Sequence, residues 1–253
     1  MWGDFIFTLE KISFKIYNSV KDLPSLWDAV AQSNVFLQTS YLSVLERSAP
    51  VNMECFYIGI FENSELIGVA LAQYLDLNLL ESFGERDKCI KTTLRNFIFK
   101  NFASHTLFLG NNMITGQNGY VFSKEIDFEY ISEILQQIAD EIIFYFKQNR
   151  VAIHLVSFKD FYENCAVKLR SYDFNRMYEF TTQPNMIFNI RPGWESIDDY
   201  LIALNTKYRT QYNRARKKAI GLEKKKMDAD EIKHYQQKVH ELYLTVANKA
   251  SFN

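Results

Sequence analysis

Glycine and proline are scarce in this chain, which has 9 and 4 of them among 253 residues. Turn-dense β-sandwiches and flexible linkers both need more of these residues, so the composition argues against either. Cysteine is also rare, because only Cys55, Cys89 and Cys165 occur, scattered and odd in number. They provide neither a disulfide framework nor paired metal-ligand spacing, so we expect a reducing compartment.

The sequence also lacks long apolar runs, and we expect no signal peptide. No run reaches the roughly 20 residues of a membrane-spanning helix, and residues 1–10 contain no basic cluster. We therefore expect a soluble, cytoplasmic protein without a membrane span. The formal net charge of -1 argues against a chain that attracts nucleic acid over its whole surface.

Several catalytic motifs are absent as well. The sequence contains no P-loop, no Gly-x-Ser-x-Gly motif, no zinc-ligand set and no complete Gly-x-Gly-x-x-Gly motif. This argues against most hydrolases, kinases and dinucleotide enzymes that carry such motifs, and we expect no bound metal.

What the chain does contain is a core-forming share of hydrophobic residues, 47%. The predicted order is a strand, two short helices, a hairpin, a strand, a long helix, a strand, a helix and two strands. These elements are expected at 12–17, 23–32, 39–47, 54–61 with 66–75, 105–109, 131–149, 151–158, 161–172, 174–180 and 186–190. The order predicts an α/β fold of the α+β type, with a central mixed sheet flanked by helices and followed by C-terminal helices.

Two segments carry this interpretation best. From Ile131 to Phe146, apolar residues recur at three- and four-residue spacing, which predicts one amphipathic helix. The near-continuous apolar run 151–158 is typical of a central strand that is covered on both faces. Within this run, His154 is a candidate catalytic base, and the alternative is a buried, hydrogen-bonded histidine.

A basic helix is expected after residue 195. Ser196 and Asp199 form a capping signal, and one continuous helix would place an apolar stripe between two basic ridges. The stripe is Ile197, Leu201, Leu204, Tyr208, Tyr212, Ala215 and Ala219, and the cations are Lys207, Arg209, Arg214, Arg216 and Lys218. These cations are candidate ligands for the phosphates of coenzyme A, a lipid-linked precursor or tRNA. Alternatively, they form a solvated linker face and pair with nearby carboxylates.

The sequence resembles a known superfamily in the order of its elements and in three passages. These passages are the loop Gly116-Gln117-Asn118-Gly119, the segment 164–174 and the helix from Ser196. They resemble the acyl-CoA N-acyltransferase (GNAT-like) fold over about residues 10–190, and more narrowly its FemAB-like branch with two such domains in tandem. The resemblance implies a GNAT-like domain at 1–195, a basic connecting helix at 196–226, and the start of a second, truncated GNAT-like domain at 227–253.

The resemblance also implies a donor site. In the superfamily, the loop after the fourth strand and the N-terminus of the next helix hold the pyrophosphate of acetyl-CoA or another acyl-CoA. The corresponding candidates are Asn111, Asn112, Gly116, Gln117 and Gly119. A tyrosine near the segment 164–174 would protonate the leaving thiolate, and the candidates are Tyr162 and Tyr172.

The function implied by this resemblance is transfer of an acetyl or aminoacyl group from acyl-CoA, or a related activated donor, to a small-molecule amine by direct attack. Two alternatives from other classes stay open. One is a non-catalytic acyltransferase-like scaffold that packs against its own second domain. The other is a nucleic-acid-binding module that uses the basic helix, which would show strongly salt-dependent binding.

Overall fold

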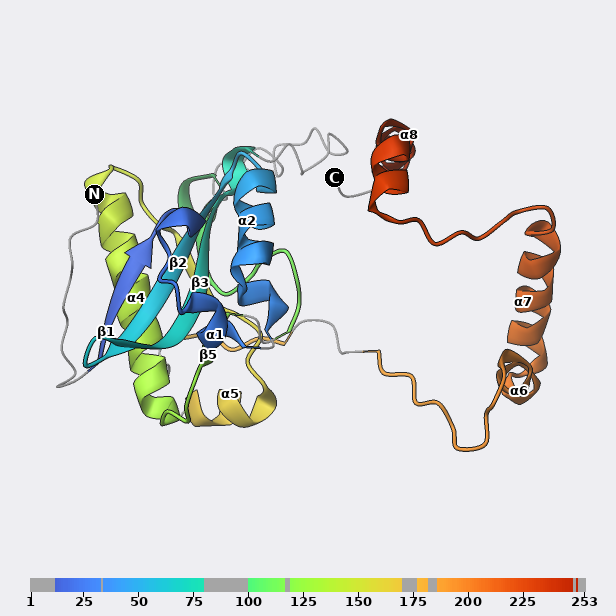
Figure 1. Ribbon diagram of the computed structural model, residues 1–253, viewed down its shortest axis with the longest axis horizontal. Helices are drawn as coiled ribbons and strands as arrows, with labels where there is room; N and C mark the ends of the chain where they lie inside the picture. The colour runs from blue at the N-terminus through green and yellow to red at the C-terminus, as the bar shows by residue number, and fades with distance from the viewer. Residues whose placement is uncertain are drawn as a thin grey trace. The chain divides into compact units, whose positions relative to one another are not determined.

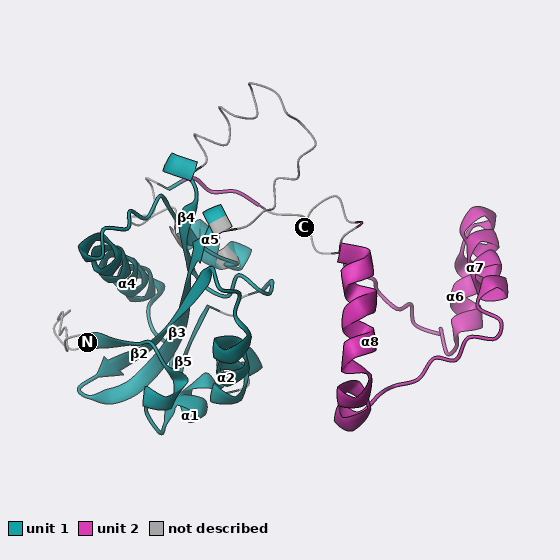
Figure 2. Cartoon of the chain, turned by 90° about the horizontal axis from the view of Figure 1, so that it is seen from above, with its two compact units in different colours: residues 1–177, 251–253 teal, residues 178–250 magenta. Residues whose placement is uncertain are grey.

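The computed structural model describes residues 12–32, 34–79, 100–116, 119–169, 177–181, 186–247 and 249. The chain divides into two compact units, Met1–Met177 with Ser251–Asn253 and Tyr178–Ala250 (Figure 2). A six-stranded mixed sheet flanked by helices lies in the first unit (Figure 1). This architecture confirms the mixed α/β class that the order of elements predicted.

The sheet contains mainly antiparallel strands. Its strands are β1 (Ile12–Tyr17), β2 (Met53–Glu62), β3 (Glu65–Asp76), β4 (His105–Leu109), β5 (Tyr120–Phe122) and β6 (Leu155–Phe158). The order is β1-β2-β3-β4-β6, with β5 paired to β3. Among the described strands, only β4 and β6 pair in parallel. The first four strands confirm the prediction, whereas the three-residue β5 is too short for a period-2 pattern to reveal.

Helices cover both faces of this sheet. The helices of the first unit whose bounds the described residues give are α1 (Trp27–Ala31), α2 (Thr39–Ser48), α4 (Phe128–Gln148) and α5 (Glu163–Leu169), with 3-10 turns at Val20–Asp22, Val35–Leu37 and Leu77–Leu79. Alternate residues of β2 face opposite sides, because Phe56 and Ile58 join the core against α4 while Tyr57 joins the core against α1 and α2.

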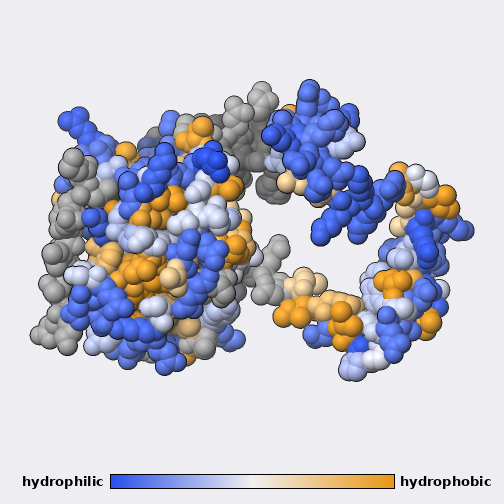
Figure 3. All heavy atoms as spheres, viewed as in Figure 1, coloured by the Kyte–Doolittle hydropathy of each residue, from blue (hydrophilic) through white to orange (hydrophobic). Residues whose placement is uncertain are grey.

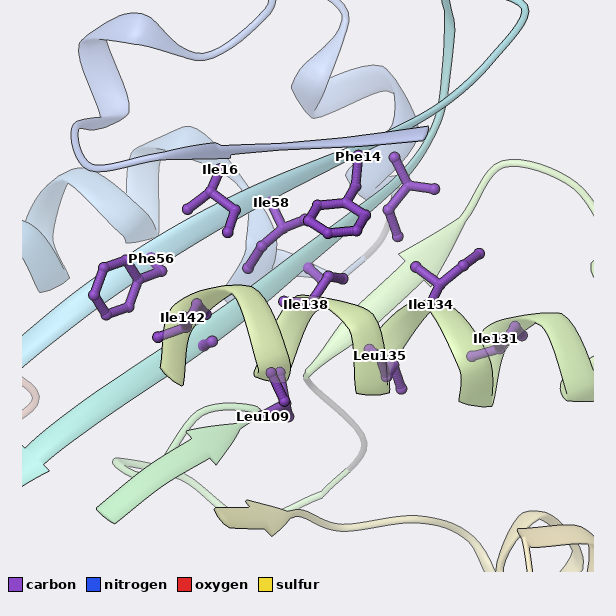
Figure 4. Packing of buried hydrophobic residues seen from close by; sticks show 14 of the residues in the cluster. Phe14, Ile16, Phe56, Ile58, Leu109, Ile131, Ile134, Leu135, Ile138 and Ile142 are labelled. Atoms are coloured by element: carbon purple, nitrogen blue, oxygen red, sulfur yellow. The ribbon is translucent and has the colours of Figure 1, made fainter. Parts of the chain in front are cut away.

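The predicted stripe of α4 forms the larger core. Its residues Ile134, Ile138 and Ile142 are at most 2% exposed and face Phe14 and Ile58 of the strands (Figure 4). Burying one such aliphatic side chain contributes about 1.5–3 kcal/mol. Helix α4 is therefore held by its contact with the sheet, as its 3.6-residue periodicity predicted.

The predicted central strand at 151–158 is wrong in length and place. In the structure β6 begins only at Leu155, and it is the last strand in the order of the described sheet. Leu155 and Val156 are 49% and 36% exposed, so the strand is not covered on both faces. The apolar run does not show whether both faces of the strand are buried, because the segments that would cover those faces lie far away in sequence.

The strands predicted at 174–180 and 186–190 are also not found among the described residues. Residues 177–180 and 186–190 form no regular element, and residues 174–176 lie outside the described part of the chain. In the second unit, Phe188 packs instead against Trp194 and Tyr200, with ring centroids 6.0 and 5.4 Å away. Aromatic packing therefore replaces strand pairing for this apolar run.

The helix predicted from Ser196 is broken in two. The structure has α6 (Ile197–Ala203) and α7 (Thr206–Lys218), followed by α8 (Ala229–Ala247). Ser196 and Asp199 form the predicted capping box, but Leu204 is extended and the side chain of Asn205 caps α7. The predicted continuous stripe is therefore wrong, because a second N-cap restarts the helix. None of the described helices is long and apolar enough to cross a membrane.

The hairpin between β2 and β3 generates a stability prediction. Its turn residues Asn63 and Ser64 both have left-handed backbones, with φ values of 48° and 71°. Replacing Ser64 with glycine removes the steric cost of this conformation, so we expect the free energy of unfolding to rise by about 0.5–1 kcal/mol. Chemical denaturation measures this change. Ser64→Ala, which keeps a Cβ atom, is the control, and an equal gain in that variant would contradict the explanation.

Candidate functional site

The Gly110–Gly119 loop connects β4 and β5, which pair one after the other with the same side of β3. β4 pairs with residues 72–76 of β3, and β5 pairs with residues 68–70. Between them, the carbonyl of Leu71 accepts the N–H of Gly110 at 2.9 Å, and the N–H of Leu71 donates to the carbonyl of Gly119 at 2.8 Å. The loop therefore leaves and rejoins the sheet at a single residue, as in an Ω-loop.

Both ends of the loop require glycine. A Cβ atom on Gly119 would lie 3.1 Å from the Cα of Gly110, and Gly110 itself has a φ of 132°. Side chains at these positions would push the loop ends apart. This close approach fixes where the loop begins and ends.

Buried amide side chains hold the interior of the loop. Gln73 is fully buried, and its Oε1 accepts the N–H of Asn112 at 2.6 Å. Asn111 is buried as well, with its Nδ2 donating to the hydroxyl of Tyr41 at 3.1 Å and its Oδ1 accepting the N–H of Met113 at 2.9 Å. Two of the loop's backbone amides thus already donate within the chain.

A lysine holds the loop from the neighbouring strand. The Nζ of Lys159 donates to the carbonyls of Asn111 and Ile114, both at 3.2 Å, and pairs with the carboxylate of Asp160 at 2.8 Å. Lys159 follows β6 directly, so the C-terminal ends of the parallel strands β4 and β6 meet at the loop. Such strand ends are the usual place for ligands in parallel sheets.

The sequence analysis missed Gln73 and Lys159. Gln73 stands in the middle of the apolar strand β3, and Lys159 comes immediately after β6. A polar residue in a buried strand needs a hydrogen-bonding partner, and that signal was present in the sequence.

The N-terminus of α4 is separate from the loop. β5 and residues 123–127 come between the two. The side chain of Asp127 caps the helix by accepting the N–H of Glu129 at 3.2 Å. Two carboxylates therefore already stand in the first turn, where the helix dipole would favour an anion.

His154 lies at the opposite end of β4 and β6 from the loop. It directly precedes β6, and its ring stacks on that of His105, the first residue of β4, with centroids 4.8 Å apart. The backbone N–H of His105 donates to the Nδ1 of His154 at 3.3 Å. Neutral His154 therefore carries its proton on Nε2, and its accepting nitrogen is already used. This arrangement favours a structural role over that of a catalytic base.

His105 also has partners on both ring nitrogens. Its Nδ1 lies 2.9 Å from the carbonyl of Ala152 and must be the protonated nitrogen, because a carbonyl only accepts. Its Nε2 lies 3.4 Å from the Nδ2 of Asn78 and 3.6 Å from a carboxylate oxygen of Asp76. Burial first, and then the neighbouring His105, lower the pKa of His154.

The remaining predicted residues fall in different places. Tyr162 is 64% exposed near the loop end of β6, and its carbonyl accepts the N–H of Cys165 at the start of α5. Gly116 is exposed with a φ of 97°. Gln117 and Tyr172 lie outside the described residues. The predicted anion ligands all lie on α7, in the second unit, and are Lys207, Arg209, Arg214, Arg216 and Lys218.

The described part of the chain contains no metal cluster, and the thiol of Cys55 is not activated. No group of three or more His, Cys, Asp or Glu side chains there is arranged to hold a metal ion. Burial raises the pKa of Cys55 to about 11, so its thiol is neutral near pH 7.

Comparison of the chain with models of protein families, with curated proteins and with solved structures found no match.

The buried amide of Gln73 provides a test of how the loop is held. In Gln73→Leu the N–H of the partly buried Asn112 loses its acceptor, so we expect the free energy of unfolding to fall by about 1–3 kcal/mol. Chemical denaturation measures the loss. The control is Gln148→Leu at the exposed end of α4, and an equal effect in the control would contradict the assignment.

The lowered pKa of His154 predicts a pH dependence. The unfolded chain binds this proton near the ordinary pKa of 6.5, whereas the folded chain binds it only at lower pH. The free energy of unfolding should therefore fall as the pH drops below about 6.5 and level off below the folded pKa. In His154→Asn, whose Oδ1 can still accept the N–H of His105, part of this fall should disappear.

Denaturation curves between pH 7.5 and pH 5 measure this difference. His240→Asn, on the exposed helix α8, is the control and should keep the full pH dependence. If both variants follow the wild-type curve, His154 does not titrate differently in the folded chain.

Proposed function

We propose that this protein is an N-acyltransferase of the GNAT type, which transfers an acyl group from acyl-CoA to an amine. The observation that carries the proposal is the Gly110–Gly119 loop, fastened at the C-terminal end of the parallel pair β4 and β6. The strand order supports it too, since antiparallel strands lead into one parallel pair whose connection contains α4.

The chemistry fits a site that works by positioning. The nitrogen of the neutral amine attacks the thioester carbonyl and the C–N bond forms. The C–S bond then breaks, the nitrogen gives up one proton, and the leaving thiolate takes up one proton to become the free thiol. Such a reaction needs the two substrates to be aligned and the developing oxyanion to be stabilised by fixed N–H groups. Neither a nucleophilic side chain nor a metal is required.

The chain's own residues can take parts of this work. The Nζ of Lys159 is a positive charge fixed beside the loop, although Asp160 offsets it, and it favours an anion such as a donor phosphate. Tyr162 is exposed at the same end of β6 and is the described candidate for the proton donor. His154 has no part in this proposal, because it lies at the other end of the strands.

A second candidate is a non-catalytic scaffold with an acyltransferase-like fold. Two observations favour it: the amides of Asn112 and Met113 already donate within the chain, and Asp127 and Glu129 occupy the N-terminus of α4. Both features reduce the number of N–H groups that could hold a pyrophosphate.

Calorimetric titration of the full chain with acetyl-CoA and with free coenzyme A separates the two candidates. An acyltransferase should bind both, and Lys159→Met should weaken binding at least tenfold, because the loop loses its anchor and the nearby positive charge. Lys147→Met, at the exposed end of α4, makes the same substitution away from the loop and should bind as the wild type does.

Two other outcomes of this titration would contradict the proposed site. A folded chain that binds neither compound supports the scaffold. Weaker binding in an Arg214→Ala/Lys218→Ala variant, with Lys159→Met unaffected, places the donor site on α7 and overturns the proposed site at the loop.

A further inference from the structure

Positively charged residues are concentrated in α7. Six of its 13 residues are cationic and none is acidic. Every residue of the helix except Tyr212 is exposed. Figure 3 shows mostly hydrophilic residues over the segment from α7 to α8. This local charge contrasts with a formal net charge of -1 for the whole chain.

The cations are not neutralised within the described part of the chain. No ion pair there involves Arg214, Arg216, Lys217 or Lys218. Arg209 differs, because its guanidinium donates to the carbonyls of Ile202 and Leu204 at 3.1 and 2.8 Å. The expectation that this face pairs with nearby carboxylates is therefore not met for these four cations.

The helix spaces its charges at regular intervals. At 100° per residue, Lys207, Arg214 and Lys218 form one ridge, and Arg209 and Arg216 form another. A rise of 1.5 Å per residue puts Arg214 about 10 Å from Lys207 and about 6 Å from Lys218 along the axis. Tyr208 lies between the two ridges and is 51% exposed.

We propose that α7 binds single-stranded nucleic acid, with its cations on the phosphates and Tyr208 stacked against a base. A phosphodiester chain offers repeated negative charges, which a ridge of separate cations can contact one after another. Aromatic side chains among cations are typical of single-strand binding, because every base has a face to stack. The proposal concerns the second unit and does not depend on the acyltransferase proposal.

A membrane surface fits these observations less well. Helices that lie in a bilayer interface present Trp, Phe or Leu on their apolar face. The apolar face of α7 consists of Tyr208, Tyr212 and Ala215. Such a face would bury little aliphatic surface in lipid, whereas phenol rings suit stacking on bases.

The number of contacts sets the expected salt dependence. Four phosphate contacts on a single strand give a slope of log K against log salt of about -2.8. Raising the salt from about 50 to 200 mM should then weaken binding about 50-fold.

Fluorescence anisotropy of the full chain with a labelled 20-nucleotide single-stranded oligonucleotide tests the proposal. We expect binding at low salt with the slope given above. In an Arg214→Gln/Arg216→Gln/Lys218→Gln variant, the slope should fall to roughly a quarter of its value, because three of four contacts are lost. The matched control, Lys147→Gln/Lys168→Gln/Lys233→Gln, removes three exposed charges elsewhere and should keep the slope.

Tyr208→Ala distinguishes stacking from charge alone. We expect roughly tenfold weaker binding with an unchanged salt slope. Circular dichroism should show that each variant keeps its helix content. The proposal is overturned by the absence of oligonucleotide binding at 50 mM salt, by equal slopes in the α7 variant and the control variant, or by binding to vesicles of anionic lipid but not to the oligonucleotide.

Discussion

The two backbone hydrogen bonds of Leu71 are the constraint on which the candidate site depends. They hold Gly110 and Gly119 side by side, so that β4 and β5 continue one line along β3 while the loop between them projects. The pairing of β4 and β5 with β3 sets where the loop leaves and rejoins the sheet, and glycine at both loop ends allows their close approach.

This constraint explains why a buried glutamine stands in β3 and a lysine directly follows β6. A loop that projects from one residue leaves backbone groups without strand partners, and a buried group of this kind costs about 1–3 kcal/mol. Gln73 supplies an acceptor to one such amide, and Lys159 supplies a donor to two carbonyls. The same groups that stabilise the loop also place the cation of Lys159 at this end of β4 and β6.

Sequence patterns predicted the elements whose signals lie within one stretch of the chain. They failed for elements whose place in the fold depends on segments far away in sequence. The stripe of α4 and the β2–β3 hairpin could be predicted, because a helical period and a polar turn lie within one stretch of sequence. The position of β6 at the end of the described sheet could not be predicted, because it depends on which strands pair beside it. For the site, Asn111 and Asn112 were found from composition, but their role in holding the loop depends on Gln73 and Tyr41, which are 39 and 70 residues away in sequence.

The excess of positive charge in α7 is the strongest reason to expect that this helix binds a partner. Since the chain has a formal net charge of -1 and α7 contributes six positive charges, the other 240 residues together carry -7. Like charges four residues apart, such as Arg214 and Lys218, destabilise a helix by about 0.2–0.5 kcal/mol a pair, and a helix of 13 residues is marginal by itself. The favourable position of three cations in its last turn offsets only part of this repulsion. A polyanion would remove the rest, so the binding that we propose would also stabilise the helix that carries it.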